Sequence, residues 1–264
     1  MYNSKELKLS VNGMELDYIT FGKGDKPLIM IQGLNTRGIK GASSSLAFMY
    51  RIFAKEYKVY LFDRRPYVEE GFSVEDIAND IASAMDELRI EDAYVLGVSE
   101  GGMVAQYLAI NRPELVKKIA LAVTLSRNND TIIEVINSWT KMAEEGRMKE
   151  FITDMAKKMY SDKYLRRYRL FMPLLTVMQR PKDIRRFVIL AKSCLTCNTY
   201  EKLNLIKCPA LVIGAKGDKI TDGAASLEIA EKLGCRIHMY DDLGHAAYEE
   251  AKDFNRIVYD FFAE

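Results

Sequence analysis

Residues 94–102 read YVLGVSEGG and place Ser99 between two glycines, Gly97 and Gly101. The apolar run at residues 94–96 is typical of a buried strand, and a helical pattern follows directly after the second glycine. A serine at such a sharp turn from strand to helix has a strained backbone, which requires small neighbouring residues. We therefore predict that this stretch is a nucleophile elbow, with Ser99 as the catalytic nucleophile and with Gly97 and Gly101 as the elbow glycines.

A serine nucleophile needs a general base, and the chain contains two histidines, His238 and His245. His238 lies inside an expected strand at residues 236–240, where a packed or surface role is favoured. His245 lies in the loop between this strand and the last helix. Because the carboxyl ends of parallel strands lie at one edge of a sheet, such a loop can reach Ser99. We predict that His245 is the base.

The imidazole in turn needs a carboxylate that fixes its tautomer and stabilises its positive charge. Asp218 follows an expected strand at residues 210–213 through a short loop, so it leaves the sheet at the same edge as Ser99. The other candidates are Asp222, Asp241 and Asp242. The last two are close neighbours of the histidine loop and are more plausible as turn residues. We predict Asp218 as the third catalytic residue.

Acyl transfer also requires hydrogen-bond donors for a developing oxyanion. We predict that the backbone N–H of Glu100, directly after the serine, is one donor, aided by the positive end of the helix dipole. The second should come from the loop at residues 31–35, and we predict the backbone N–H of Leu34. The Glu100 side chain has two interpretations, an acid that satisfies the helix start or a charge in the pocket.

Around the elbow, short apolar runs recur as expected for strands buried on both faces of a parallel sheet. They lie at residues 28–31, 59–62, 94–98, 119–123, 210–213 and 236–240. Near the N-terminus, two alternating runs flank Asn12-Gly13, which is typical of a tight antiparallel hairpin. Helical patterns separate most of the runs. We predict an α/β fold with a mostly parallel central sheet, an antiparallel N-terminal hairpin and helices on both faces.

Two of the helices have recognisable ends. Residues Ser73 to Asp76 resemble a capping box, followed by apolar residues on one helical face. A second helix is expected over residues 101–111, because the proline at position 113 disfavours its continuation.

No clear strand is expected between about residues 126 and 207, where the patterns are helical. We predict that residues 126–207 form a helical cap, inserted into a core made of residues 1–125 and 208–264. Methionines and a phenylalanine recur here near helical spacing: Met142, Met148, Phe151, Met155 and Met159. Such stripes usually pack in a core, and some of these side chains could also face a pocket beneath the cap.

The predicted cap also carries a basic run: Arg166, Arg167, Arg169, Arg180, Arg185 and Arg186. Most such charges lie on solvated helix faces, and acidic residues are interleaved with them here. Two other interpretations stay open, namely attraction of carboxylate-bearing substrates and a cap-mediated contact in a homodimer.

The chain has 264 residues, of which 48% are hydrophobic, so a sizeable core can be buried. Its 38 basic and 37 acidic residues give a net charge of +1, which provides no long-range field to hold nucleic acid or an anionic membrane. No apolar run reaches the roughly 18 residues of a transmembrane span, and the N-terminus lacks the apolar region of a signal peptide. We expect a cytoplasmic protein whose partner is a small-molecule substrate, without nucleic-acid or membrane binding.

The four cysteines read as free thiols in a reducing compartment: Cys194, Cys197, Cys208 and Cys235. Cys194 and Cys197 form a CxxC pattern, but no second pair of ligands for zinc lies nearby. A redox-active pair would directly follow a strand, whereas this one lies in an expected helix. We expect an inert pair, no metal site and no cofactor.

Together these residues resemble the α/β-hydrolase superfamily, and specifically its group with a helical cap domain. The resemblance spans nearly the whole chain, and the order of Ser99, Asp218 and His245 is that of the family's triad. It also includes the opening hairpin, Gln32-Gly33, Asp63-Arg64-Arg65 and Gly244-His245. Gln32 stands where the family usually has histidine, and Pro66 stands where it often has glycine, so the subfamily stays open.

The resemblance implies a serine hydrolase, and we expect it to cleave a small carboxylic ester through an acyl-serine intermediate. One alternative is a C–C bond hydrolase, lactonase or lyase that uses the same triad. A second alternative is a ligand-binding relative without turnover, against which the apparently complete triad argues. The fold alone does not choose among these activities.

Overall fold

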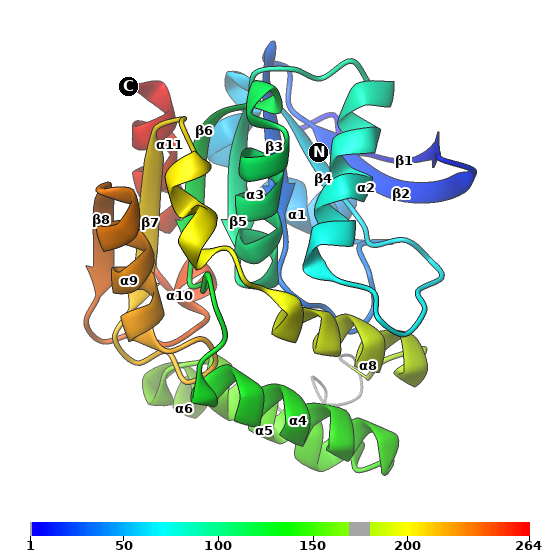
Figure 1. Ribbon diagram of the computed structural model, residues 1–264, viewed down its shortest axis with the longest axis vertical. Helices are drawn as coiled ribbons and strands as arrows, with labels where there is room; N and C mark the ends of the chain where they lie inside the picture. The colour runs from blue at the N-terminus through cyan, green and yellow to red at the C-terminus, as the bar shows by residue number, and fades with distance from the viewer. Residues whose placement is uncertain (1, 169–179) are drawn as a thin grey trace.

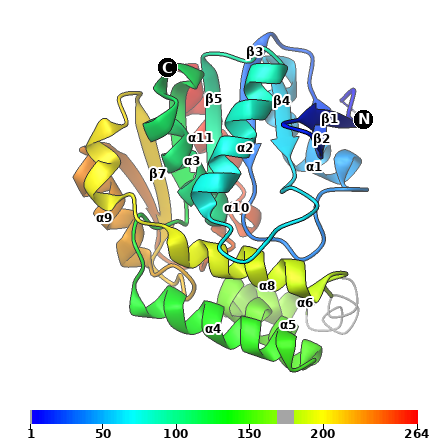
Figure 2. The same cartoon turned by 45° about the vertical axis from the view of Figure 1, so that its right-hand side comes forward.

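The computed structural model describes residues 2–168 and 180–264, which form an eight-stranded sheet flanked by helices (Figures 1 and 2). The order across the sheet is β1-β2-β4-β3-β5-β6-β7-β8. The two pairs β1–β2 and β2–β4 are antiparallel, and every other pair is parallel. The strands are β1 (Lys5–Val11), β2 (Met14–Phe21), β3 (Lys26–Ile31), β4 (Tyr57–Phe62), β5 (Ala93–Val98), β6 (Val116–Ala122), β7 (Ala210–Ala215) and β8 (Arg236–Tyr240). The predicted fold class is confirmed.

Helices cover both faces of this sheet, and each face has its own apolar core. Helices α2, α3 and α9 pack on one face, and α1 and α11 pack on the other (Figure 2). The bounds of these helices are α1 (Ser43–Met49), α2 (Val74–Glu87), α3 (Glu100–Asn111), α9 (Gly223–Leu233) and α11 (Phe254–Ala263). The short α10 (Ala247–Glu250) and the 3-10 turns η1 (Arg51–Lys55) and η2 (Pro113–Leu115) complete the connections. Since helices shield both faces, strands such as β5 are buried along their whole length, as their apolar sequences require.

The local signals in the sequence act as expected at two places. Asn12 and Gly13 both have positive φ angles, 49° and 78°, which fits a tight turn that matches the twist of the β1–β2 hairpin. Ser73 and Asp76 form a full capping box, in which each side chain accepts a hydrogen bond from the other residue's backbone N–H.

Between β6 and β7 the described chain is helical apart from a single β-bridge, and it lies across one end of the sheet (Figures 1 and 2). It contains α4 (Asp130–Glu144), α5 (Met148–Met159), α6 (Asp162–Tyr168), α8 (Ile184–Ser193), η4 (Cys194–Thr196) and η5 (Tyr200–Leu205). The beginning and the end of this helical segment are joined by a hydrogen bond, in which the N–H of Thr199 donates to the carbonyl of Ser126 at 2.7 Å. The division into a core and a cap at residues 126 and 207 stays a prediction. Within residues 2–168 and 180–264, no helix has both the length and the apolar character needed to cross a membrane.

We expect Ser73→Ala to lower the free energy of unfolding by about 1 kcal/mol, because it leaves the first turn of α2 without its capping acceptor. Urea denaturation followed by circular dichroism measures this change. Ser44→Ala is the matched control, since Ser44 is an exposed serine on α1 outside any cap. Equal stability of the two variants would show that the capping box does not stabilise α2.

Candidate active site

Ser99 lies at the junction of β5 and α3, with a φ of 55° and a ψ of −121°. Few residues other than glycine adopt this conformation, which costs on the order of 1–3 kcal/mol. Two hydrogen bonds hold the strained residue in place. Its N–H donates to the carbonyl of Ala122 at 2.9 Å, and its own carbonyl accepts from the hydroxyl of Thr124 at 2.7 Å. The surrounding structure therefore fixes the serine at the edge of the sheet.

The glycines on either side of Ser99 are required by the close approach of α3 to the sheet. A Cβ atom at Gly101 would lie 2.0 Å from the carbonyl oxygen of Ile31, and one at Gly97 would lie 2.4 Å from the carbonyl oxygen of Gly101. Both separations are far shorter than a non-bonded carbon–oxygen contact. A side chain at either position would push the helix away from the strands and displace the serine.

The imidazole of His245 lies between Ser99 and Asp218. Its Nε2 is 2.9 Å from the Ser99 Oγ, and its Nδ1 is 2.8 Å from the Asp218 Oδ2. His245 is 3% exposed and Asp218 is 7% exposed, so both polar side chains are buried in contact with each other. Three residues that are far apart in the sequence thus form one hydrogen-bonded chain, which is the arrangement that activates a serine.

The Asp218 carboxylate is held by more than the histidine. Its Oδ1 accepts from the N–H groups of Ile220 and Thr221 at 2.8 and 3.0 Å, and its Oδ2 also accepts from the Thr221 hydroxyl. Burial alone would raise the pKa of this carboxyl, but the nearby His245 and these backbone donors outweigh burial and lower it below the ordinary value. The group is therefore kept ionised next to the imidazole.

The other candidates have different roles in the structure. Asp222 caps α9 by accepting from the N–H of Ala224 at 3.0 Å, and Asp241 is exposed and pairs with Lys216 at 2.7 Å. Asp242 is exposed in the loop after β8. His238 lies on β8, where its ring contacts that of Tyr240 at a centroid distance of 4.6 Å.

The loop after β3 passes directly beside the serine. A Cβ atom at Gly33 would lie 3.1 Å from the Ser99 Cβ and 3.6 Å from its Oγ, so the loop that continues into Leu34 passes the serine hydroxyl closely. Glu100 is the first residue of α3, and the N–H groups of a first helical turn have no acceptor within the helix. Both of these positions suit donors toward an oxyanion, and their role stays a prediction.

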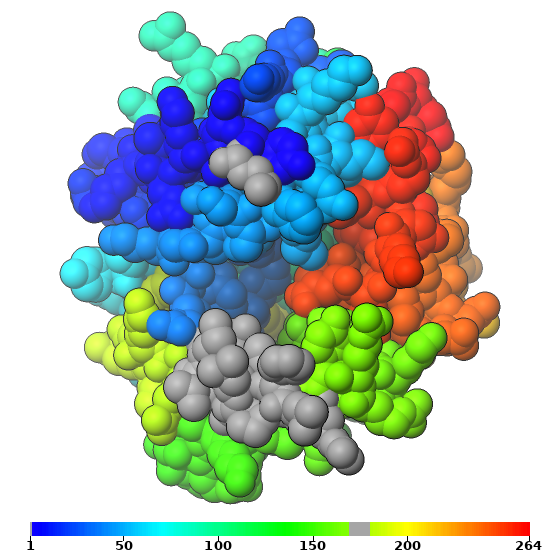
Figure 3. Space-filling view, turned by 180° about the vertical axis from the view of Figure 1, so that it is seen from behind, coloured from blue at the N-terminus to red at the C-terminus, as the bar shows by residue number. Residues whose placement is uncertain are grey.

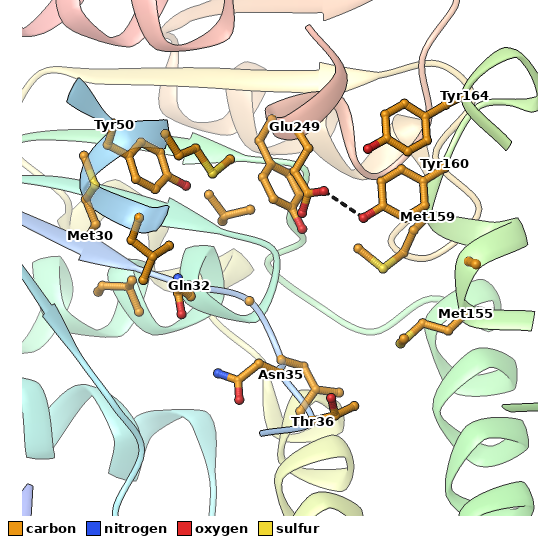
Figure 4. A pocket seen from close by; sticks show the side chains of 18 of the residues that line it. Met30, Gln32, Asn35, Thr36, Tyr50, Met155, Met159, Tyr160, Tyr164 and Glu249 are labelled. Carbon is orange, nitrogen blue, oxygen red and sulfur yellow. Dashed lines mark hydrogen bonds between the residues drawn. The ribbon is translucent and has the colours of Figure 1, made fainter. Parts of the chain in front are cut away.

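A cavity of about 700 Å³ opens beside this site (Figure 4). Its wall includes Gly33, which lies beside Ser99 in space, and Val98, which directly precedes Ser99 in the sequence. Helix α5 contributes Met155 and Met159, whereas the other members of the methionine and phenylalanine stripe are buried in a hydrophobic cluster: Met142, Met148 and Phe151. In the view from behind, the surface is hollowed where the blue N-terminal part, the red-orange C-terminal part and the green cap helices meet (Figure 3).

A family model described as the alpha/beta hydrolase fold matches residues 26–252 of this chain. The chain belongs to the α/β-hydrolase fold family. This assignment agrees with the sheet order, with the serine at the strand-to-helix turn, and with the position of His245 after the last strand.

Curated relatives and solved structures of this α/β-hydrolase carry several activities in their names. The 2-hydroxy-6-oxononadienedioate/2-hydroxy-6-oxononatrienedioate hydrolase of Paraburkholderia xenovorans (strain LB400) is 26% identical over 95% of this chain and 91% of its own length. The crystal structure of the enol-lactonase from Burkholderia xenovorans LB400 has a TM-score of 0.85 at 23% identity, over 98% of this chain and 100% of that one. A thermophilic esterase from Thermogutta terrifontis has a TM-score of 0.79 at 16% identity, over 98% of both chains. The two structures show the shared fold.

The side chain of Glu100 points away from the cavity of this hydrolase and into a buried ion pair. Its Oε2 accepts from Nε of Arg64 at 3.1 Å and also from Nη2, and the two residues are 1% and 5% exposed. The same guanidinium donates to the carbonyl of Gln32 in the loop that carries Leu34. Arg64 therefore connects both predicted oxyanion positions. Sequence reasoning missed this role, because nothing in the sequence near Arg64 or Glu100 indicates that the two side chains pair.

The cap arginines do not line the cavity of this hydrolase within the described residues. Arg166, Arg167, Arg180 and Arg185 are exposed, and Arg169 lies outside the described residues. Arg186 donates to the carbonyls of Arg64 and Arg65 at 3.0 Å each, so it anchors α8 to the loop after β4. Attraction of carboxylate-bearing substrates by these arginines therefore gains no support from the cavity.

The two cysteines of the CxxC pattern are buried free thiols. Burial raises the pKa of Cys194 well above its usual value and that of Cys197 to about 12, which disfavours the reactive thiolate. Across the described ranges, no group of three or more His, Cys, Asp or Glu side chains is arranged to hold a metal ion.

We expect Glu100→Gln to lower the free energy of unfolding by about 3–5 kcal/mol, because it leaves the buried Arg64 cation without its counter-charge. Urea denaturation measures the loss, and the double variant Glu100→Gln with Arg64→Met should recover part of it. Glu15→Gln, which breaks an exposed pair with Lys8, is the control and should change stability far less. Equal effects at the two sites would contradict a stabilising buried pair.

Proposed function

We propose that this α/β-hydrolase cleaves a carboxylic ester of a small molecule through an acyl-serine intermediate. The observation that supports the proposal most directly is the 2.9 Å contact between Nε2 of His245 and Oγ of Ser99. With Nδ1–H donated to Asp218, Nε2 carries a lone pair and accepts the serine proton. The hydroxyl thereby becomes a nucleophile beside the open cavity.

In the proposed reaction, Oγ of Ser99 attacks the ester carbonyl while His245 takes its proton. The N–H groups of Leu34 and Glu100 stabilise the resulting oxyanion, and Asp218 stabilises the imidazolium. The C–O bond to the alcohol then breaks, and the imidazolium protonates the departing alkoxide. Water, deprotonated by the same imidazole, attacks the acyl-serine and releases the acid.

The composition of the cavity wall favours an ester over the substrate named for the relative from Paraburkholderia. That name describes a dioate, which carries two carboxylates. A buried dianion requires cationic partners, and the cavity wall contains no lysine or arginine among the residues that the structure describes. A C–C bond hydrolase, lactonase or lyase with an uncharged substrate would use the same triad, and the assay below distinguishes these reactions from ester hydrolysis.

We expect Ser99→Ala to abolish labelling by a fluorophosphonate probe and to reduce hydrolysis of a panel of p-nitrophenyl esters by at least about 10³-fold. Gel fluorescence and release of p-nitrophenol measure the two effects, with Ser44→Ala as control. Labelling that persists in Ser99→Ala would remove Ser99 from the reaction. Rapid labelling of the wild type without ester turnover would favour a reaction on a C–C bond or lactone.

We expect Asp218→Asn to reduce kcat by roughly 10³–10⁴-fold, because an amide does not stabilise the imidazolium and favours the wrong tautomer. The variant should also lose a pH-dependent part of its stability. Since the pKa of the Asp218 carboxyl is lower in the fold than in the unfolded chain, its stabilisation is present above the unfolded value and is lost as the pH falls through the folded one. Steady-state kinetics and urea denaturation from neutral to acidic pH test both effects, and an unchanged kcat would exclude Asp218 from the triad.

A further inference from the structure

Glu249 is the one side chain with a formal charge among the described residues that line the cavity. It lies on α10, four residues after His245, and its carboxylate accepts from the hydroxyl of Tyr160 at 2.7 Å (Figure 4). Glu249 keeps substantial exposure, and Figure 4 shows that this exposed side chain faces the interior of the cavity. The catalytic mechanism proposed above makes no use of this group.

The wall around Glu249 is rich in tyrosine. Five tyrosines line the cavity: Tyr50, Tyr160, Tyr164, Tyr168 and Tyr248. The rings of Tyr160 and Tyr164 stack at a centroid distance of 4.6 Å, and that of Tyr168 lies 4.4 Å from Tyr164. A cation already lies near this row, since the guanidinium carbon of Arg167 is 5.8 Å from the centroid of Tyr168. The remaining wall is mostly aliphatic, with methionines on both the core and the cap side.

A carboxylate beside several aromatic rings in an otherwise apolar cavity is complementary to a cation. Aromatic faces attract ammonium groups, and the attraction strengthens when water is excluded. A carboxylate provides the counter-charge that a desolvated ammonium requires. An anionic substrate group would be repelled by Glu249, and a purely aliphatic one would leave the carboxylate without a new partner.

We propose that Glu249 and the surrounding tyrosines bind an ammonium group on the substrate, so that this hydrolase selects cationic esters over neutral and anionic ones. The inference rests on the proposed function for the reaction, but the binding of the cation itself does not require turnover. Glu249 is on this view a specificity-determining residue, which contacts the non-reacting part of the substrate.

Binding to the Ser99→Ala variant tests the proposal without hydrolysis of the probe. Isothermal titration calorimetry would compare three esters of similar size: butyrylcholine, its uncharged isostere 3,3-dimethylbutyl butyrate, and the anionic monobutyl succinate. We expect butyrylcholine to bind at least about tenfold more tightly than the isostere, and monobutyl succinate to bind most weakly. Equal affinities, tightest binding of the anion, or no binding of any of the three would overturn the proposal.

Substitutions in the cavity wall test whether Glu249 causes the preference for butyrylcholine. Adding Glu249→Gln to Ser99→Ala keeps the acceptor for Tyr160 and removes the charge, so the ratio of the butyrylcholine affinity to the isostere affinity should fall severalfold, to the part that the aromatic rings supply. Glu250→Gln is the matched control, because it removes a carboxylate from the same short helix. The Glu250 carboxylate accepts a hydrogen bond from Ser161 and does not line the cavity. Tyr164→Leu provides a second variant, since loss of the ring should reduce the ratio while Glu249 stays. A ratio that Glu249→Gln leaves unchanged would refute the assignment.

The pH dependence gives an independent readout. The protein atoms around the Glu249 carboxyl partly desolvate it and so raise its pKa, although the side chain stays exposed to the cavity, and hydrogen bonds from Tyr160 and Tyr248 only partly oppose this effect. The titratable groups facing it are Tyr160 and Tyr164 from the cap, Tyr50 from the core, and Tyr248, Glu250 and His245 from its own segment. Because the protonated carboxyl is neutral, the preference for butyrylcholine should disappear on acidification at a higher pH than for an ordinary glutamate. A ratio that is constant from neutral pH to pH values below an ordinary glutamate pKa would contradict this role.

Turnover by the wild type separates the two proposals. Ser99-dependent hydrolysis of neutral p-nitrophenyl esters without any preference for the cationic probe would support the ester hydrolase and reject the ammonium site. A preference in binding that depends on Glu249, without hydrolysis of any ester, would support the ammonium site and reject the ester hydrolase.

Discussion

The strained backbone of Ser99 is the constraint on which the rest of the site depends. A serine with a φ of 55° is stable here because Ala122 at the end of β6 and Thr124 just after that strand hold it by hydrogen bonds. The turn is so tight that Gly97 and Gly101 have no room for side chains. The loop after β3 lies beside Ser99, and α3 begins at the next residue, Glu100. The nucleophile, the loop and the start of the helix thus meet at this one strained residue.

The other two members of the hydrogen-bonded chain, Asp218 and His245, reach Ser99 because parallel strands end at a common edge. Asp218 follows β7 and His245 follows β8, and both loops fold back toward β5. The His245 loop is also tied to the cap: the N–H of Ala246 donates to the carbonyl of Met159 at 2.8 Å. Because that carbonyl lies at the end of α5, a direct backbone hydrogen bond joins this helix to the residue after His245. Met159 also lines the cavity, so the cavity wall and the His245 loop are in contact.

The fold could be predicted because its signals are local. The apolar runs, the Asn12-Gly13 turn and the Ser73 capping box each specify nearby backbone, and the elbow combines a strand, a turn and a helix within a few residues. The Arg64–Glu100 pair and the carboxylate of Glu249 have no such signal. Acids at the start of a helix usually face solvent, and only tertiary packing places one of these in an ion pair and the other in the cavity. Hydrophobic patterns along the sequence do not show which distant side chain will pack against a given acidic residue.

This division explains how one fold supports the different activities named for its relatives. The elbow and its supports lie in the sheet and in α3, where almost every position is buried and a change of side chain disturbs packing. Residues of β3 and β5 line the cavity next to the elbow, but the rest of its wall comes from outside the sheet, mainly from α1, α5, α6 and the short α10. At these outer positions a methionine, a tyrosine or a carboxylate can be exchanged without a change in the backbone of the elbow. A charge such as Glu249 can therefore alter which molecules bind while leaving the serine, the imidazole and their 2.9 Å contact in place.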